Sequence, residues 1–135
     1  DQKSIRKEVA LSVEDWLGKD GVGENERIFV ERMTDLGARP AVTGQSLALD
    51  FGSTRFAYLR HRGRISLSMW GIKKHPNYAE DDQRSALLHA FERAGFKPSN
   101  SNFEGEPSIF IPAENDTAQW AALTAVFKNL FHQLV

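Results

Sequence analysis

Residues 46–70 read SLALDFGSTRFAYLRHRGRISLSMW, and this stretch decides the fold. Apolar and polar side chains alternate over most of its length, which is typical of β-strands with one buried face. The pairs Gly52-Ser53 and Arg62-Gly63 interrupt the alternation and have the composition of two-residue hairpin loops. The stretch therefore predicts three antiparallel strands in sequential order, a β-meander.

Both predicted loops place large apolar side chains on the same face of the meander, and a slip of one residue would destroy this agreement. The first loop sets Asp50 opposite Arg55, a pair of opposite charge. The second loop sets Tyr58 opposite Leu67. The predicted core face consists of Leu47, Leu49, Phe56, Tyr58, Ile65, Leu67 and Met69. The predicted outer face consists of Ser46, Ala48, Asp50, Arg55, Ala57, Leu59, His61, Arg64, Ser66, Ser68 and Trp70.

Helical patterns lie on both sides of this meander along the chain. Apolar residues recur at helical spacing in residues 4–17, 26–36, 82–94 and 117–134. Residues 108–112, bounded by prolines, read as a short strand. The predicted element order is α-α-β-β-β-α-β-α. The predicted fold class is α+β, with an antiparallel sheet of three to four strands packed on helices.

The glycine-containing residues 19–25 divide the chain into two parts of unequal size. We interpret them as a flexible connector, because glycine relaxes the backbone between periodic segments. Residues 1–18 then form an N-terminal helix that is a candidate appendage, and residues 26–135 form a single α+β domain. Because the sequence starts at Asp1 rather than methionine, we expect this domain to be part of a larger protein.

The composition excludes several classes of protein. With 135 residues, 41% of them hydrophobic and 26% charged, the chain has the size and balance of one globular domain with its own core. It has no cysteine, which excludes disulfide frameworks, thiol catalysis and cysteine-based zinc sites. No apolar run approaches the roughly 18 residues of a membrane-spanning helix, so no membrane partner is expected. A cysteine-free chain suits a reducing compartment, and we expect a cytoplasmic location.

A net charge of −1 hides a segregation of charge along the chain. Residues 51–79, the acid-free stretch, carry six basic side chains and no Asp or Glu. The remaining residues carry eleven basic and eighteen acidic side chains, a net charge of −7. A surface that keeps one sign of charge over a patch attracts partners of the opposite sign even when the whole chain is nearly neutral.

The acid-free stretch supports the hypothesis of a non-catalytic domain that binds DNA or RNA. Basic side chains neutralise phosphates, and an exposed aromatic ring stacks on bases. The predicted binding residues are Arg55, Arg60, Arg62, Arg64, Trp70, Lys73 and Lys74. Two other interpretations remain open: the arginines only solvate a hairpin tip, or they bind an acidic protein surface. The hypothesis also requires that residues 4–17 leave the outer face uncovered.

A second class of hypothesis is a protein-interaction or chaperone-like module. The last predicted helix has an apolar stripe at helical spacing, which is typical of a core helix. The same stripe is the candidate surface for a homodimer or a protein partner, as is the strand edge at residues 109–111. The stripe consists of Trp120, Leu123, Phe127, Leu130, Phe131 and Leu134.

A third hypothesis starts from the order helix, three antiparallel strands, helix, strand. This order resembles the core of the PD-(D/E)xK nuclease superfamily, which would imply a divalent metal held by acids on the second and third strands. The predicted second strand, residues 55–60, has no acid, and the third, residues 65–70, has neither acid nor lysine. The resemblance leaves open a degenerate relative that binds DNA without cutting it. The sequence predicts no catalytic residue, metal or cofactor.

Overall fold

The computed structural model describes residues 13–19, 22–44, 46–99 and 106–135. Of the predicted N-terminal helix, residues 13–17 are helical, and residues 4–12 lie outside the described residues. No helix among the described residues is long and apolar enough to cross a membrane.

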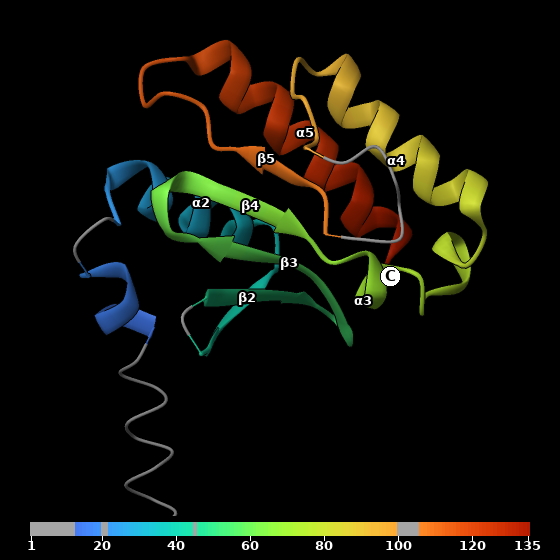
Figure 1. Cartoon of the computed structure of the whole chain (residues 1–135), viewed down its shortest axis with the longest axis horizontal. Helices are drawn as coiled ribbons and strands as arrows, with labels where there is room; N and C mark the ends of the chain where they lie inside the picture. The colour runs from blue at the N-terminus through green and yellow to red at the C-terminus, as the bar shows by residue number, and fades with distance from the viewer. Residues whose placement is uncertain (1–12, 20–21, 45, 100–105) are drawn as a thin grey trace, which may run out of the picture.

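The described chain folds into an α+β structure around one five-stranded antiparallel sheet, so the predicted fold class is confirmed (Figure 1). The strands lie in sequential order: β1 (Arg39–Thr43), β2 (Ser46–Phe51), β3 (Thr54–Arg60), β4 (Arg64–Leu67) and β5 (Ser108–Phe110). The predicted count of three to four strands is wrong, because β1 was missed. Its Pro40 argues against a strand in the sequence, but an edge strand such as β1 tolerates proline.

Three longer helices accompany the sheet: α2 (Glu24–Asp35), α4 (Asp81–Arg93) and α5 (Thr117–Gln133). Helix α5 begins as predicted, with the Asp116 side chain accepting a hydrogen bond from the Gln119 backbone N–H at 3.1 Å. Glu80 caps the start of helix α4, and its backbone N–H donates to the Gln83 side chain at 2.9 Å. Shorter elements also form: η1 (His61–Gly63), α3 (Met69–Ile72) and η2 (Pro76–Tyr78).

The predicted register holds for the first pair, Asp50 opposite Arg55, and is wrong beyond it. A β-bulge shifts the pairing by one residue, so Leu49 lies opposite Ala57 instead of Phe56. Bulges add a residue without interrupting the sheet, and the alternation of the sequence does not reveal them.

The second hairpin closes through the three residues of η1 instead of a two-residue loop. Within η1, Arg62 takes a left-handed backbone conformation, with φ of 66°. Tyr58 therefore pairs with Ser66 rather than Leu67.

These shifts exchange Tyr58 and Leu59 between the two faces of the sheet. Leu59 is fully buried in the core, whereas Tyr58 is half-buried on the opposite side. The core face consists of Leu47, Leu49, Ala57, Leu59, Ile65, Leu67 and Ile109, with Phe56 added by the bulge. The outer face consists of Arg39, Ala41, Thr43, Ser46, Ala48, Asp50, Arg55, Tyr58, Arg60, Arg64, Ser66, Ser108 and Phe110.

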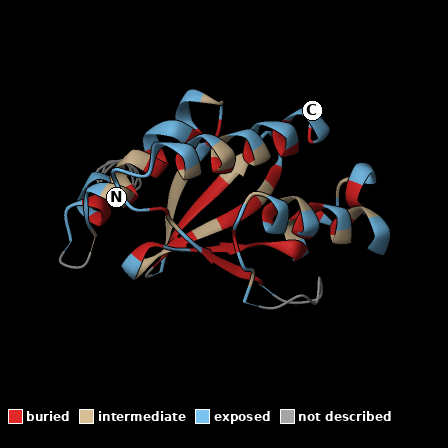
Figure 2. Cartoon of the chain, turned by 90° about the horizontal axis from the view of Figure 1, so that it is seen from above, coloured by how far each residue is buried: buried red, intermediate tan, exposed pale blue. Residues whose placement is uncertain are grey.

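Helix α5 lies at the centre of the core, and its apolar stripe is buried there, as expected for a core helix. The Phe127 ring is 5.7 Å from Phe29 of α2, 5.8 Å from Phe56 of β3 and 5.3 Å from Phe91 of α4, between ring centres. Figure 1 shows α4 and α5 above the strands. Figure 2 shows that the sheet and the helix sides turned toward it are buried, while the outer sides of the helices are exposed. Among the described residues, none of the three longer helices packs on the outer face, and the one-turn helix α3 lies at one end of it.

Residues 13–17 join the core beside α2. The side chains of Trp16 and Leu17 are 1% and 7% exposed. The Trp16 ring stacks on His61 of η1, with 5.4 Å between ring centres. This described end of the predicted helix 4–17 therefore packs at the tip of the second hairpin.

Candidate functional site: a basic groove

A groove of about 520 Å³ lies at one end of the outer face, where the β2–β3 turn meets α3. Three basic side chains from three different segments line it, against one carboxylate. We call this hollow the basic groove, and its lining residues are Arg39, Asp50, Gly52, Ser53, Arg55, Tyr58, Ser68, Trp70, Gly71 and Lys74.

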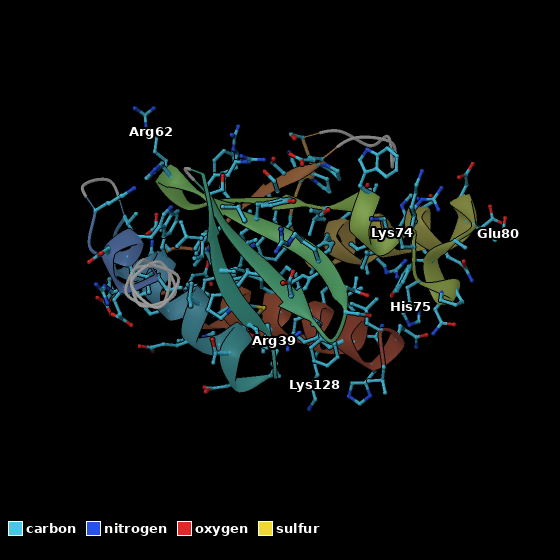
Figure 3. The ribbon with its side chains drawn as sticks, turned by 90° about the horizontal axis from the view of Figure 1, so that it is seen from below. Arg39, Arg62, Lys74, His75, Glu80 and Lys128 are labelled. Atoms are coloured by element: carbon cyan, nitrogen blue, oxygen red, sulfur yellow. The ribbon has the colours of Figure 1, made fainter. Side chains whose placement is uncertain are left out.

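The basic groove continues into a second hollow of about 270 Å³. The two hollows share Ser53, Arg55, Gly71 and Lys74, and the second extends to His75 and Pro76. Figure 3 shows Lys74 and His75 close together at one end of the molecule. We call the two adjoining hollows together the track, which is lined by Arg39, Arg55 and Lys74 against the single carboxylate of Asp50.

The close approach of α3 to β3 builds one wall of the groove. An ideal Cβ on Gly71 would stand 1.9 Å from the backbone oxygen of Arg55, so only glycine fits there. The Ser68 backbone N–H donates to the Phe56 carbonyl at 2.8 Å, and the Ser68 hydroxyl accepts from the Gly71 N–H at 3.3 Å. These contacts place Trp70 and Lys74, on either side of Gly71, at the groove.

Arg55 is held in place by the neighbouring strand. Its Nε and Nη2 donate to the two oxygens of Asp50 at 2.9 and 3.3 Å. This hydrogen bonding raises the pKa of Arg55 above its ordinary value, so the guanidinium stays charged. The side chain is 38% exposed, and its guanidinium carbon lies 6.0 Å from the centre of the Tyr58 ring. Arg55 therefore offers a fixed positive charge to the groove.

Trp70 is the exposed aromatic residue of the site, at 68% exposure. The Lys73 Nζ lies 4.3 Å from the centre of its ring, within the range of a cation–π contact. The prediction that Trp70 ends the third strand is wrong, since it belongs to α3. The helical turn brings Lys73 beside Trp70, which a strand could not do because alternate residues would face opposite sides.

Arg60, another predicted binding residue, is half-buried and already hydrogen-bonded within the protein. It donates to the hydroxyl oxygens of Ser46 and Ser66, both at 2.9 Å, and to the Glu106 carboxylate at 2.8 Å. Its guanidinium carbon also lies 5.5 Å from the centre of the Tyr58 ring. Glu106 lies far outside the acid-free stretch, so the fold supplies a counter-charge that the local sequence did not predict.

The predicted binding residues are divided between two ends of the sheet. Arg55, Trp70 and Lys74 line the basic groove, with Lys73 against Trp70. Arg62 and Arg64 are exposed near the η1 tip, and Figure 3 shows Arg62 at the opposite end from Lys74.

Sequence reasoning missed Arg39 and Tyr58 as groove residues. Arg39 was missed because β1 was missed: once β1 pairs with β2, Arg39 lies opposite Asp50. The exposed Arg39 guanidinium donates to the Gly52 carbonyl in the β2–β3 turn. Tyr58 was missed because the predicted register placed it in the core.

No group of three or more His, Asp or Glu residues among the described positions is arranged to hold a metal ion. Comparison of the chain with known protein families, curated proteins and solved structures finds no match in any of the three. The functional argument therefore rests on the geometry of the site.

Proposed function

We propose that this protein is a non-catalytic binding domain for an anionic polymer, a nucleic acid, and that the basic groove is its binding site. The observation that carries the proposal is the convergence of Arg39, Arg55 and Lys74 on one hollow beside an exposed tryptophan. Cations that neutralise phosphates, next to an aromatic ring, form the combination with which many proteins bind nucleic acid strands.

The shape and charge of the groove favour a polymer over a single small anion. The track runs on from the groove past Lys74 to His75, so successive phosphates can follow it. Asp50 reduces the net charge, but it also fixes the orientation of Arg55. A fixed guanidinium loses less side-chain entropy on binding than a free one.

The test is the binding of a fluorescently labelled, mixed-sequence oligonucleotide, followed by fluorescence anisotropy at several salt concentrations. The variant Arg39→Glu/Lys74→Glu reverses two exposed charges of the groove. It is expected to bind at least about tenfold more weakly. The slope of the logarithm of the binding constant against the logarithm of the salt concentration should also become shallower by about one to two. The melting temperature of each variant, followed by circular dichroism, verifies that it is folded.

The matched control is Arg62→Glu/Arg64→Glu, which makes the same change in net charge at the η1 tip. It is expected to keep most of the affinity, because its two positions lie outside the groove. An equal loss in both variants would mean that net charge, not the groove, determines binding. No binding by the unmodified protein at low salt would refute the proposal. Equally tight binding of polyglutamate would point instead to an acidic protein surface as the partner.

A further inference from the structure

We propose that the basic groove binds single-stranded nucleic acid in preference to a double helix, with one unpaired base stacked on Trp70. This inference rests on the proposed function and names its substrate class.

The two aromatic residues of the groove, Tyr58 and Trp70, differ in exposure and in their contacts. The half-buried Tyr58 ring already contacts two cations: the guanidinium carbons of Arg55 and Arg60 lie 6.0 and 5.5 Å from its centre. It therefore belongs to the wall of the groove. Trp70 carries its ring into solvent, at 68% exposure, with a cation from Lys73 beside it. Trp70 is thus the stacking platform, and the groove cations take the flanking phosphates.

Single-stranded and double-stranded nucleic acids differ in the accessibility of their base faces. In a double helix the faces of the bases are stacked on one another, and only their edges and the phosphates meet a protein. A ring such as Trp70 can stack on a base only where the strand is unpaired. Stacking on Trp70 therefore selects the single strand.

The surface around the groove cations is concave. Proteins that read a duplex place a helix or a two-stranded ribbon into its major groove. Here the cations line a hollow, and the helix beside it, α3, has four residues, which is one turn. A hollow with charged walls suits a flexible strand better than a convex, rigid rod.

Three probes with the same number of phosphates separate the possibilities: a thymidine single strand, a thymidine–adenine duplex of half its length, and a polyphosphate chain without bases. Of the three tryptophans, Trp16 and Trp120 are 1% and 2% exposed, so quenching of the intrinsic fluorescence by acrylamide reports mainly on Trp70. The single strand is expected to bind about tenfold more tightly than the duplex and to shield Trp70 from acrylamide.

The variant Trp70→Ala is expected to bind the single strand about tenfold more weakly and so to lose its preference over the duplex. Its affinity for polyphosphate should stay unchanged. Trp70→Phe is expected to keep part of the preference, because it keeps a smaller ring. The matched control is Phe110→Ala on β5, which removes an aromatic ring of similar exposure, 64%, outside the groove. It is expected to change neither the affinity for the single strand nor the affinity for polyphosphate.

The outcomes distinguish this inference from the proposed function. Equal affinity for single strand and duplex, or a single-strand preference that survives Trp70→Ala, would overturn the inference while the groove remained a polyanion site. Failure of all three probes to bind would remove the proposed function as well.

Discussion

The arginine and lysine side chains of the outer face differ in how firmly they are held. Arg55 and Arg60 each donate to fixed oxygen atoms on neighbouring strands. Lys74 and Arg62 are exposed instead. A cation held by hydrogen bonds offers an anionic ligand donors in a fixed orientation and loses little entropy on binding. An exposed cation attracts the ligand over a wider volume. The groove combines both kinds through Arg55 and Lys74.

Gly71 is the residue whose replacement should most directly change the groove. In Gly71→Ala the new methyl group would collide with the Arg55 carbonyl, a backbone atom that cannot swing away. Alanine favours helices by about 1 kcal/mol over glycine, so any loss of stability is steric. We expect a loss of about 1–3 kcal/mol in the free energy of unfolding, measured with urea. We also expect weaker oligonucleotide binding, because α3 must move away from β3.

The control for this variant is Gly44→Ala in the β1–β2 turn. Gly44 has φ of 58° and no atom within 4 Å of an added Cβ, so alanine there meets conformational strain without a collision. That strain is about 1–2 kcal/mol. Gly44→Ala should therefore lower stability and leave oligonucleotide binding intact. Unchanged binding in Gly71→Ala would show that α3 does not shape the groove.

At the scale of elements, the sequence predicts the helices well and the strand pairing less well. The long helices carry strong periodicity and side-chain caps, and those beginning near Asp81 and Thr117 appear within a residue of the predicted positions. The strand pairing depends on the bulge in β3 and on the η1 turn. At the bulge, the consecutive residues Phe56 and Ala57 are both buried. Two consecutive buried residues fit two registers equally well, so the alternation of the sequence does not decide between them.

The Phe127 ring of helix α5 packs against rings from three other elements of the core. Phe127→Ala should lower the free energy of unfolding by about 3–5 kcal/mol, because it leaves a cavity among four elements. Phe127→Leu should lose less, and it serves as the second variant if the alanine variant fails to fold. Phe110→Ala, at an exposed position, should change stability by less than about 0.5 kcal/mol in the same urea titration. A small effect of Phe127→Ala would contradict the central place of α5.

At the scale of the whole molecule, stability should depend on alkaline pH through Tyr78. Burial raises the pKa of this phenol above its ordinary value of 10. The folded state therefore favours the protonated form, and its contribution to stability is complete below pH 10 and is lost as pH rises through the raised pKa. The unfolding free energy should fall above pH 10, and it should fall less steeply in Tyr78→Phe. Parallel curves for the two proteins in urea titrations at successive pH values would contradict this assignment.

The positive charge of the candidate site could be predicted from the sequence, but its position on the folded protein could not. The sequence contains the acid-free stretch, but only the folded sheet separates Arg62 and Arg64 from Arg55 and Lys74. Two features of the site involve residues outside the acid-free stretch: Glu106 forms an ion pair with Arg60, and Arg39 on β1 lines the groove. Long-range contacts of this kind have no local signature in one sequence. The cytoplasmic location, the homodimer and the separation of residues 1–18 from the domain stay predictions.

The sequential strand order has a consequence for synthesis of the chain on the ribosome. Strands β1 to β4 follow one another directly, and such short-range pairing forms quickly. Their apolar face, however, is covered by α5, whose residues 117–133 are made last among the described elements. Until those residues leave the exit tunnel, the nascent sheet presents Phe56 without its neighbours Phe127 and Phe131. During that interval the chain should be a client for chaperones that bind apolar strands.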